Sequence, residues 1–124
     1  MTGEKLKTYR DLRVWQESKD LAKAVYAGTD QLPPSERYGL CSQMRRAAVS
    51  VPANIAEGYG RQNRGEYVQF LGIANGSLRE LETYIIIASE MNLLAEGHEL
   101  LHICDSVGRK LSALRSSLRP DRTR

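Results

Sequence analysis

Long apolar runs, aromatic residues and cysteines are all scarce in this sequence of 124 residues. No run approaches the roughly 20 apolar residues that a membrane-spanning helix needs, so no membrane partner is expected. The first residues also lack the apolar core of a signal peptide, and we therefore expect a cytoplasmic protein. Aromatic residues make up only 6% of the chain. This scarcity argues against a platform on which single-stranded bases would stack.

Cysteine is nearly absent, since Cys41 and Cys104 are the only two in the chain. Each falls on the apolar side of a predicted helix, where cysteine behaves as a small buried hydrophobe. Because the cytoplasm also disfavours disulfides, we expect two buried and reduced thiols.

Strand patterns are missing as well, because no stretch shows a convincing alternation of apolar and polar residues. Four segments instead repeat apolar residues at helical spacing and are joined by short loops. This pattern predicts an all-α, up-down-up-down four-helix bundle over residues 9–118. Residues 1–8 are expected to form a flexible N-terminus, and residues 119–124 a basic tail.

The first two helices have recognisable ends. Asp11 is the predicted N-cap of the first helix, and Trp15 and Tyr26 lie on its predicted apolar face, which makes Trp15 a core anchor. The helix should end before Pro33, because the residue that precedes a proline is pushed out of helical geometry. Ser35 is the predicted cap of the second helix.

The second helix carries the least regular stretch of the sequence. Pro52 lies inside its apolar pattern, so a bend is expected there. Gly58 and Gly60 are expected to end the helix, because glycine readily adopts the left-handed geometry of a helix stop. Arg45 and Arg46 stand on the flank and on the outer side of this helix.

The third helix has the clearest periodicity. Gly72 and Gly76 interrupt it, and we expect them to let another backbone approach closely. The segment that contains Tyr84, Ile86 and Ile87 is apolar all round, more than a one-sided helix requires, so we expect a subunit interface there. The seam itself alternates steps of four and three and comprises Tyr67, Leu71, Ala74, Leu78, Leu81, Ile85 and Ala88.

Three separated blocks of the sequence resemble one protein family. They read YRDLRVWQESKDLAKAVY, RRAAVSVPANIAEGYGR and EYVQFLGIANGSLRELETYIIIASEMNLL, and together they run from about Tyr9 to Leu94. These blocks are similar to the four-helix-bundle proteins also called 23S rRNA intervening-sequence proteins. The resemblance implies a four-helix bundle that assembles into a ring-shaped homopentamer. It also implies an RNA context, since some members are encoded inside insertions in large-subunit rRNA genes and a related group assists a reverse transcriptase. The motif residues in this chain are Pro52, Asn54, Glu57 and Gly58.

One segment, His98 to His102, matches the H-E-x-x-H pattern in which two helical histidines bind zinc and the glutamate activates water. If Leu100 and Cys104 face the core, however, both histidines point to solvent with no cleft around them. A third protein ligand is missing too, because the chain has only two histidines and catalytic zinc needs three protein ligands. We therefore expect no zinc metalloprotease, no cofactor and no enzyme, while adventitious surface zinc stays open.

The net charge of the chain is only +3, but it is unevenly distributed. Residues 1–23 hold six Lys or Arg against four Asp or Glu, and residues 100–124 hold six against two. Residues 61–99 hold three against six. One interpretation is pairing between the acidic third helix and its basic neighbours. The other is a basic surface for nucleic acid.

A set of arginines is the remaining candidate site. It predicts a non-enzymatic accessory protein that binds RNA, or another nucleic acid, through phosphates rather than base sequence. A homo-oligomer would repeat the set and so raise avidity. The alternative function is a scaffold that binds a protein partner and has no nucleic-acid role. Glu57 and Arg61 are expected to form a structural pair, the alternative being a ligand contact by Asn54 and Glu57. The set comprises Arg10, Arg13, Arg45, Arg46, Arg61 and Arg64.

Overall fold

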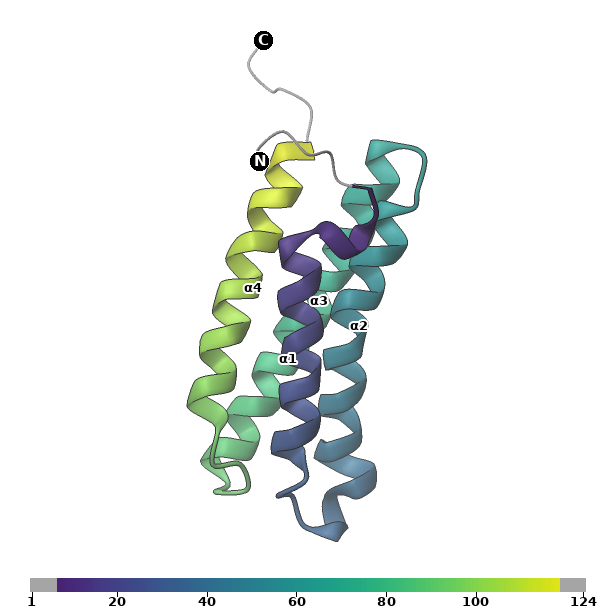
Figure 1. Cartoon of the computed structure of the whole chain (residues 1–124). Coiled ribbons are helices and arrows are strands. Elements are labelled where there is room, and N and C mark those ends of the chain that lie inside the picture. The colour runs from purple at the N-terminus through teal and green to yellow at the C-terminus, as the bar shows by residue number, and fades with distance from the viewer. Residues whose placement is uncertain (1–6, 119–124) are drawn as a thin grey trace.

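The computed structural model describes residues 7–118, and these form four α-helices in an up-down-up-down arrangement with no strand among them (Figure 1). The predicted all-α bundle is therefore confirmed. The expectations for the first six residues and for the basic tail lie outside the described residues. The helices are α1 (Arg13–Thr29), α2 (Ser42–Tyr59), α3 (Arg64–Glu90) and α4 (Gly97–Leu118). Along residues 7–118, no helix combines the length and the hydropathy that crossing a bilayer requires.

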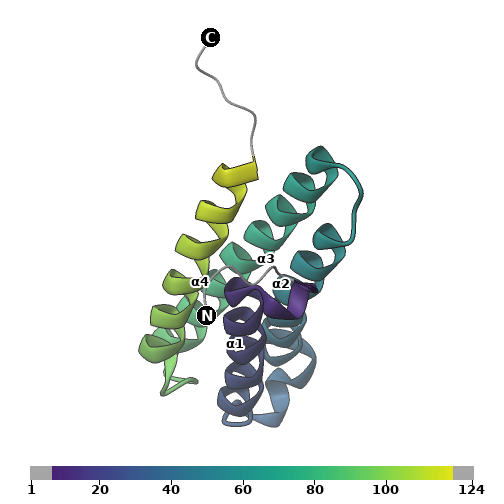
Figure 2. The ribbon, with the colours of Figure 1, turned by 45° about the horizontal axis from the view of Figure 1, so that its top comes forward.

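The core lies where the four apolar faces meet. In α3 the predicted seam is buried at every position from Leu71 to Ala88, and in α4 the seam is buried from Leu100 to Leu111. α1 and α3 stand at opposite corners of the bundle, as Figures 1 and 2 show from two sides. α2 and α3 form the most extensive of the helix–helix contacts.

Gly58 explains why α2 and α3 pack so closely. A β-carbon at this position would lie 2.8 Å from Cβ of Phe70 and 3.2 Å from the carbonyl oxygen of Tyr67. The expectation that Gly72 and Gly76 serve this purpose is wrong within the chain. Gly76 has open space beside it, and the group nearest to Gly72 is the guanidinium of Arg115, 3.6 Å from a built β-carbon.

The buried face of α1 differs from the predicted one. Val14, Ser18, Leu21 and Val25 point into the core, whereas Trp15 is only partly buried and packs at the edge of the core. Tyr26 is 45% exposed. The expectation that Tyr26 lies on the buried face is wrong, and Trp15 packs against the rim of the core, because large rings also pack well there.

Several helix ends also differ from the sequence expectations. Asp11 belongs to a 3₁₀ turn, Tyr9–Asp11, that precedes α1, and its carboxylate accepts the backbone N–H groups of Lys7 (2.9 Å) and Thr8 (3.2 Å). These two bonds lower the pKa of Asp11. Ser35 lies in another 3₁₀ turn, Pro34–Glu36, and a π-helical turn, Arg37–Cys41, separates it from α2.

The C-terminal end of α2 also differs from the sequence expectations. α2 runs through Pro52 without a break and ends at Tyr59, and Gly60 caps it in right-handed geometry with φ −79°. Gly58 and Gly60 therefore do not act as left-handed stops. Asn92 is the one non-glycine residue with positive φ in the described range, at 59°, and it lies in the short connection between α3 and α4.

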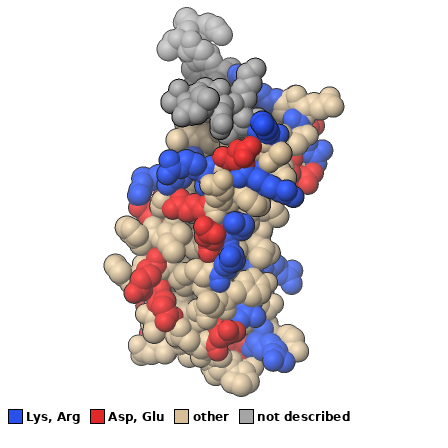
Figure 3. Space-filling model, in the orientation of Figure 1, with Lys and Arg blue, Asp and Glu red and all other residues tan. Residues whose placement is uncertain are grey.

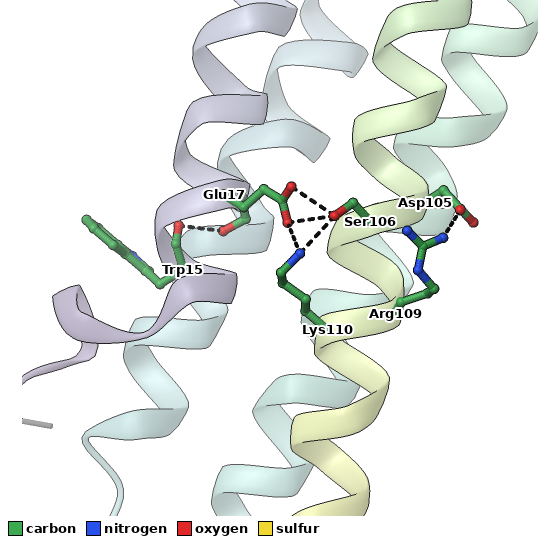
Figure 4. A network of polar contacts seen from close by, with 7 residues as sticks. Trp15, Glu17, Asp105, Ser106, Arg109 and Lys110 are labelled. Carbon is green, nitrogen blue, oxygen red and sulfur yellow. Dashed lines mark hydrogen bonds and ion pairs between the residues drawn. The ribbon is translucent and has the colours of Figure 1, made fainter. Parts of the chain in front are cut away.

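A polar cluster joins α1 to α4 (Figure 4). The Ser106 hydroxyl lies 2.9 and 3.0 Å from the two carboxylate oxygens of Glu17, and Nζ of Lys110 lies 3.0 Å from Oε1 of Glu17. The expected pairing of the acidic third helix with its neighbours is wrong for the described residues. The ion pair found on α3 is internal, between Arg79 and Glu82 at 2.9 Å.

Candidate nucleic-acid interface

One edge of α1 carries both cations and aromatic rings. Trp15, Lys19, Lys23 and Tyr26 follow each other at steps of four, four and three, which places them on one flank of the helix. The contact between Tyr26 and the guanidinium of Arg45 places this flank beside α2. We call this surface the basic–aromatic face, and it comprises Tyr9, Arg10, Trp15, Lys19, Lys23, Tyr26 and Arg45.

Three cations of the basic–aromatic face lie over aromatic rings. Nζ of Lys19 is 5.5 Å from the ring centre of Trp15, and the guanidinium carbon of Arg45 is 4.6 Å from that of Tyr26. The guanidinium carbon of Arg10 lies 5.7 Å from the ring of Tyr9, which packs edge-on against Trp15 at 5.1 Å. The quadrupole of a ring attracts a cation but carries no net charge, so these contacts orient the cations without neutralising them.

Arg45 is the most firmly held member of the face. Its Nε donates to Oγ1 of Thr29 at 2.8 Å, and one Nη donates to the carbonyl oxygen of Tyr26 at 3.2 Å. The same Nη pairs with the carboxylate of Asp30 at 2.9 Å. Because the last carbonyls of a helix lack partners within it, a cation from α2 satisfies one of them and also meets the negative end of the α1 dipole.

The surface charge agrees with this description. Figure 3, in the orientation of Figure 1, shows Lys and Arg side chains that follow one another down the middle and right of the molecule, over α1 and α2. A group of Asp and Glu side chains lies to the left, over α4 and the adjoining edge of α1. Lys and Arg side chains also lie at the upper left of Figure 3, so the two edges of α1 differ in charge in the lower part of the molecule.

The predicted arginine set is not brought together at one place. Arg45 and Arg46 lie near the start of α2, whereas Arg61 follows α2 and Arg64 begins α3 at the other end of the bundle. At 1.5 Å per residue, the length of α2 separates the two pairs by more than about 20 Å. Arg13 lines a shallow hollow with Lys110 on the other edge of α1.

Four arginines of the predicted set are exposed and have no ion pair with the described residues, namely Arg10, Arg13, Arg46 and Arg64. Arg61 is held twice, by Glu57 at 2.6 Å and by the ring of Phe70 at 4.7 Å. The predicted structural pair between Glu57 and Arg61 is confirmed. Only Arg10 and Arg45 of the predicted set lie on the basic–aromatic face.

The other motif residues have structural contacts. Nδ2 of Asn54 donates to the carbonyl oxygen of Ser50 at 2.8 Å and to its hydroxyl at 3.0 Å. The Ser50 hydroxyl in turn lies 2.7 Å from that of Ser77, which links α2 to α3. Pro52 is buried on the same helix. These contacts hold the α2–α3 pair together.

His98 and His102 are both exposed on α4, as the sequence predicts. Within residues 7–118, no group of three or more His, Cys, Asp or Glu side chains could hold a metal ion. Both cysteines are free thiols. Cys104 is buried, as predicted, but Cys41 is only partly buried, so that part of the expectation is wrong.

Sequence reasoning missed most of the basic–aromatic face. Lys19 and Lys23 were available as a signal, since they follow Trp15 at four-residue steps on one flank of an amphipathic helix. Placing Trp15 and Tyr26 in the core concealed that signal. The contacts of Tyr9 and Arg45 with this flank depend on the tertiary fold, so no local sequence pattern predicts them.

Comparison with models of protein families finds one match, which covers residues 10–113 and is described as 23S rRNA-intervening sequence protein. A search of curated proteins finds no match to the chain.

Proposed function

The chain belongs to the 23S rRNA-intervening sequence protein family, and from that premise we propose that it is a non-enzymatic, RNA-associated protein that holds the phosphate backbone on its basic–aromatic face. The observation that carries this proposal is the row of cations that lie over aromatic rings. Lys19 has in addition an exposed pair with Asp20 at 3.7 Å, and Arg45 pairs with Asp30 at 2.9 Å. An RNA phosphate can replace the exposed Asp20 carboxylate at Lys19 at little cost, because exposed ion pairs contribute only about 0–1 kcal/mol.

The dimensions of the face fit a nucleic-acid backbone. From Trp15 to Tyr26 the helix rises about 17 Å, which spans about five phosphates along one strand of a duplex. Trp15 packs against the core, and Lys19 and Arg45 lie over the rings of Trp15 and Tyr26, so stacking on unpaired bases should contribute little. Recognition therefore follows phosphate position and RNA shape, not base sequence.

The test measures RNA affinity against salt concentration. Fluorescence anisotropy with a structured RNA compares the wild-type chain with the double variant Lys19→Gln, Lys23→Gln. Each phosphate contact contributes about 0.9 to the slope of log K against log salt in duplex DNA, so the variant should lose between about 1 and 2 from that slope. The matched control is Arg79→Gln, Arg109→Gln, which removes the same charge from α3 and α4.

The control should bind as the wild-type chain does. If both double variants lost the same amount from the slope of log K against log salt, net charge alone would attract RNA. The assignment to the basic–aromatic face would then be wrong. Absence of binding by the wild-type chain at low salt would refute the RNA role. The scaffold function would then be the better account.

The outer side of α3 supports a second proposal, that the chain forms a homo-oligomer, with a ring-shaped pentamer as the form that family membership favours. Ile86 and Ile87 are 42% and 41% exposed in the single chain, and Ile73 and Met91 are 47% and 56% exposed. By helical spacing Ile87 shares one flank with Ile73, Tyr84 and Met91, whereas Ile86 points to the other flank. Burial of such a stripe against a second copy would remove apolar surface from water.

Light scattering tests this assembly. A pentamer would have five times the chain mass of 13.9 kDa. Ile73→Lys with Ile87→Lys places two charges on the Tyr84 flank and should yield smaller species, while Ile86→Lys should have the smaller effect. A wild-type monomer at micromolar concentration would refute the proposal.

A further inference from the structure

A hollow of about 290 Å³ lies between the end of α1 and the start of α2. Its walls include Pro33 and Cys41, and its polar groups include the side chains of Arg37, Arg45 and Ser42. Arg45 also belongs to the basic–aromatic face, so the hollow continues that face at its α2 end. We call it the Arg37–Arg45 hollow.

The walls of the hollow are fixed by the chain itself. Pro33 and Pro34 restrict the backbone on one side. On the other side the carboxylate of Glu36 accepts the backbone N–H of Leu40 at 3.1 Å and stabilises the π-helical turn. Glycine at position 39 leaves room for this bond, because a β-carbon there would lie 2.8 Å from Oε1 of Glu36 and would displace the carboxylate. The hollow is therefore preformed.

The charge of the hollow favours an anion. Asp30 also lines it, but its carboxylate is engaged by Arg45 at 2.9 Å. Arg37 is exposed and has no ion pair with the described residues. Two guanidinium groups against one carboxylate leave one positive charge. A hydroxyl group and apolar walls beside this charge suit a phosphate attached to a sugar and a base.

We propose that the Arg37–Arg45 hollow binds a terminal phosphate monoester together with its nucleotide, such as the phosphorylated 5′ end of an RNA. The volume lies at the lower limit of about 300 Å³ for small-molecule sites, enough for one nucleotide and too small for more. A monoester carries about −1.5 to −2 at pH 7, whereas a backbone diester carries a single charge. Two arginines therefore prefer a chain end to an internal phosphate. The proposal rests on the RNA role for its ligand, and its test separates the two.

The first experiment compares two RNAs of one sequence, with a 5′-phosphate or a 5′-hydroxyl. Wild-type chain should bind the phosphorylated RNA about tenfold more tightly, as expected for a charge-assisted bidentate contact. Arg37→Gln should abolish that preference and leave affinity for the 5′-hydroxyl RNA nearly unchanged. Arg64→Gln, which removes an equal charge at the other end of α2, should keep the preference. Circular dichroism checks that both variants fold.

Cys41 provides an independent readout, since it lines the hollow while Cys104 is buried. Burial raises the pKa of the Cys104 thiol to about 12, so at pH 8 a thiol reagent should modify Cys41 alone in the folded chain. AMP should slow the modification of Cys41 several-fold. Inorganic phosphate should slow it less if sugar and base contribute, and adenosine should have no effect.

The outcomes distinguish the two proposals. Equal affinity for the two RNAs, with no protection of Cys41 by AMP, would overturn the nucleotide site while RNA binding on the basic–aromatic face stands. Protection of Cys41 by AMP without any RNA binding would support the site for a free mononucleotide and refute the RNA role. Loss of the 5′-phosphate preference in Arg64→Gln as well as in Arg37→Gln would also overturn the site.

Discussion

The two edges of α1 hold their charges in different ways. On the edge toward α4, Glu17 pairs with Lys110 at 3.0 Å and accepts the Ser106 hydroxyl, so the charges cancel within the chain. On the edge toward α2, Lys19 lies 5.5 Å from the centre of the Trp15 ring, which is neutral. An ion pair and a cation–π contact can contribute similar energy to a fold. The cation–π contact leaves the charge of its cation in place, and Lys19 has only an exposed pair with Asp20 at 3.7 Å, so this edge keeps more of its charge for a partner.

This comparison shows why composition is a poor guide to the charge of a surface. α1 contains Arg13, Glu17, Lys19, Asp20 and Lys23, so it is almost neutral as a segment. The helical period separates Lys19 and Lys23 from Glu17, which pairs with Lys110 of α4. Asp20 lies between the two edges, and its carboxylate is 3.7 Å from Nζ of Lys19. A helix of nearly zero net charge therefore gives the bundle one basic edge.

Among the substitutions on the basic edge of α1, removal of the Trp15 ring should destabilise the fold most. Trp15→Ala deletes a ring that packs against the core, supports Tyr9 and lies under Lys19. The free energy of unfolding should fall by about 3 kcal/mol, the lower end for loss of a large aromatic side chain. Urea denaturation measures the change. Trp15→Phe should lose less because it keeps a ring, and equal stability of Trp15→Ala and wild type would show that the ring contributes no packing.

The position of α2 can be disturbed without touching the α4 edge. Gly58→Ala brings a β-carbon within 2.8 Å of Phe70 and 3.2 Å of a backbone oxygen, and this overpacking should lower the unfolding free energy by about 2 kcal/mol. Gly76→Ala is the matched control, because open space lies beside Gly76 and alanine is the better helix former by about 1 kcal/mol. The two substitutions should shift the thermal midpoint in opposite directions. A stabilised Gly58→Ala would contradict the close approach of α2 and α3.

The contrast between the edges also explains what the sequence could predict. The α3 seam was predictable because one heptad pattern repeats from Tyr67 to Ala88 and nothing competes with it. In α1, Trp15 and Tyr26 have apolar rings at positions next to the true core, and a pattern of apolar residues cannot separate centre from rim. The two lysines between them were the better evidence.

The basic–aromatic face also depends on tertiary contacts that no local sequence pattern predicts. Arg45 lies over Tyr26 only because the segment between α1 and α2 folds into a 3₁₀ turn and a π-helical turn. The side chain of Glu36 stabilises that segment, and glycine at position 39 leaves room for the Glu36 carboxylate. Such long-range fits decide which arginines meet, and the predicted set was accordingly divided between two ends of the bundle.

The α4 edge is tested by a double-mutant cycle of Glu17→Gln and Lys110→Met, which keeps most of both side chains. Both groups are about one-third exposed, so their coupling should be about 1 kcal/mol at low salt and should shrink in 1 M salt. Lys23→Met removes the same charge from the other edge. RNA affinity should fall in Lys23→Met and stay close to wild type in Lys110→Met. The reverse order would show that the paired edge, not the basic–aromatic face, is the binding surface.

The smallest expected effect concerns the contact that joins the basic edge to α2. Tyr26→Leu keeps an apolar side chain beside Arg45 but removes the ring that lies 4.6 Å from its guanidinium carbon. Arg45 retains its bonds to Thr29, to the Tyr26 backbone carbonyl and to Asp30, so the unfolding free energy should fall by only about 0.5 kcal/mol, a typical value for an exposed cation–π pair. Because the ring carries no charge, RNA affinity at low salt should change less than twofold. A loss as large as that of Lys23→Met would mean that the Tyr26 ring touches RNA itself, and the face would then act through stacking as well as through charge.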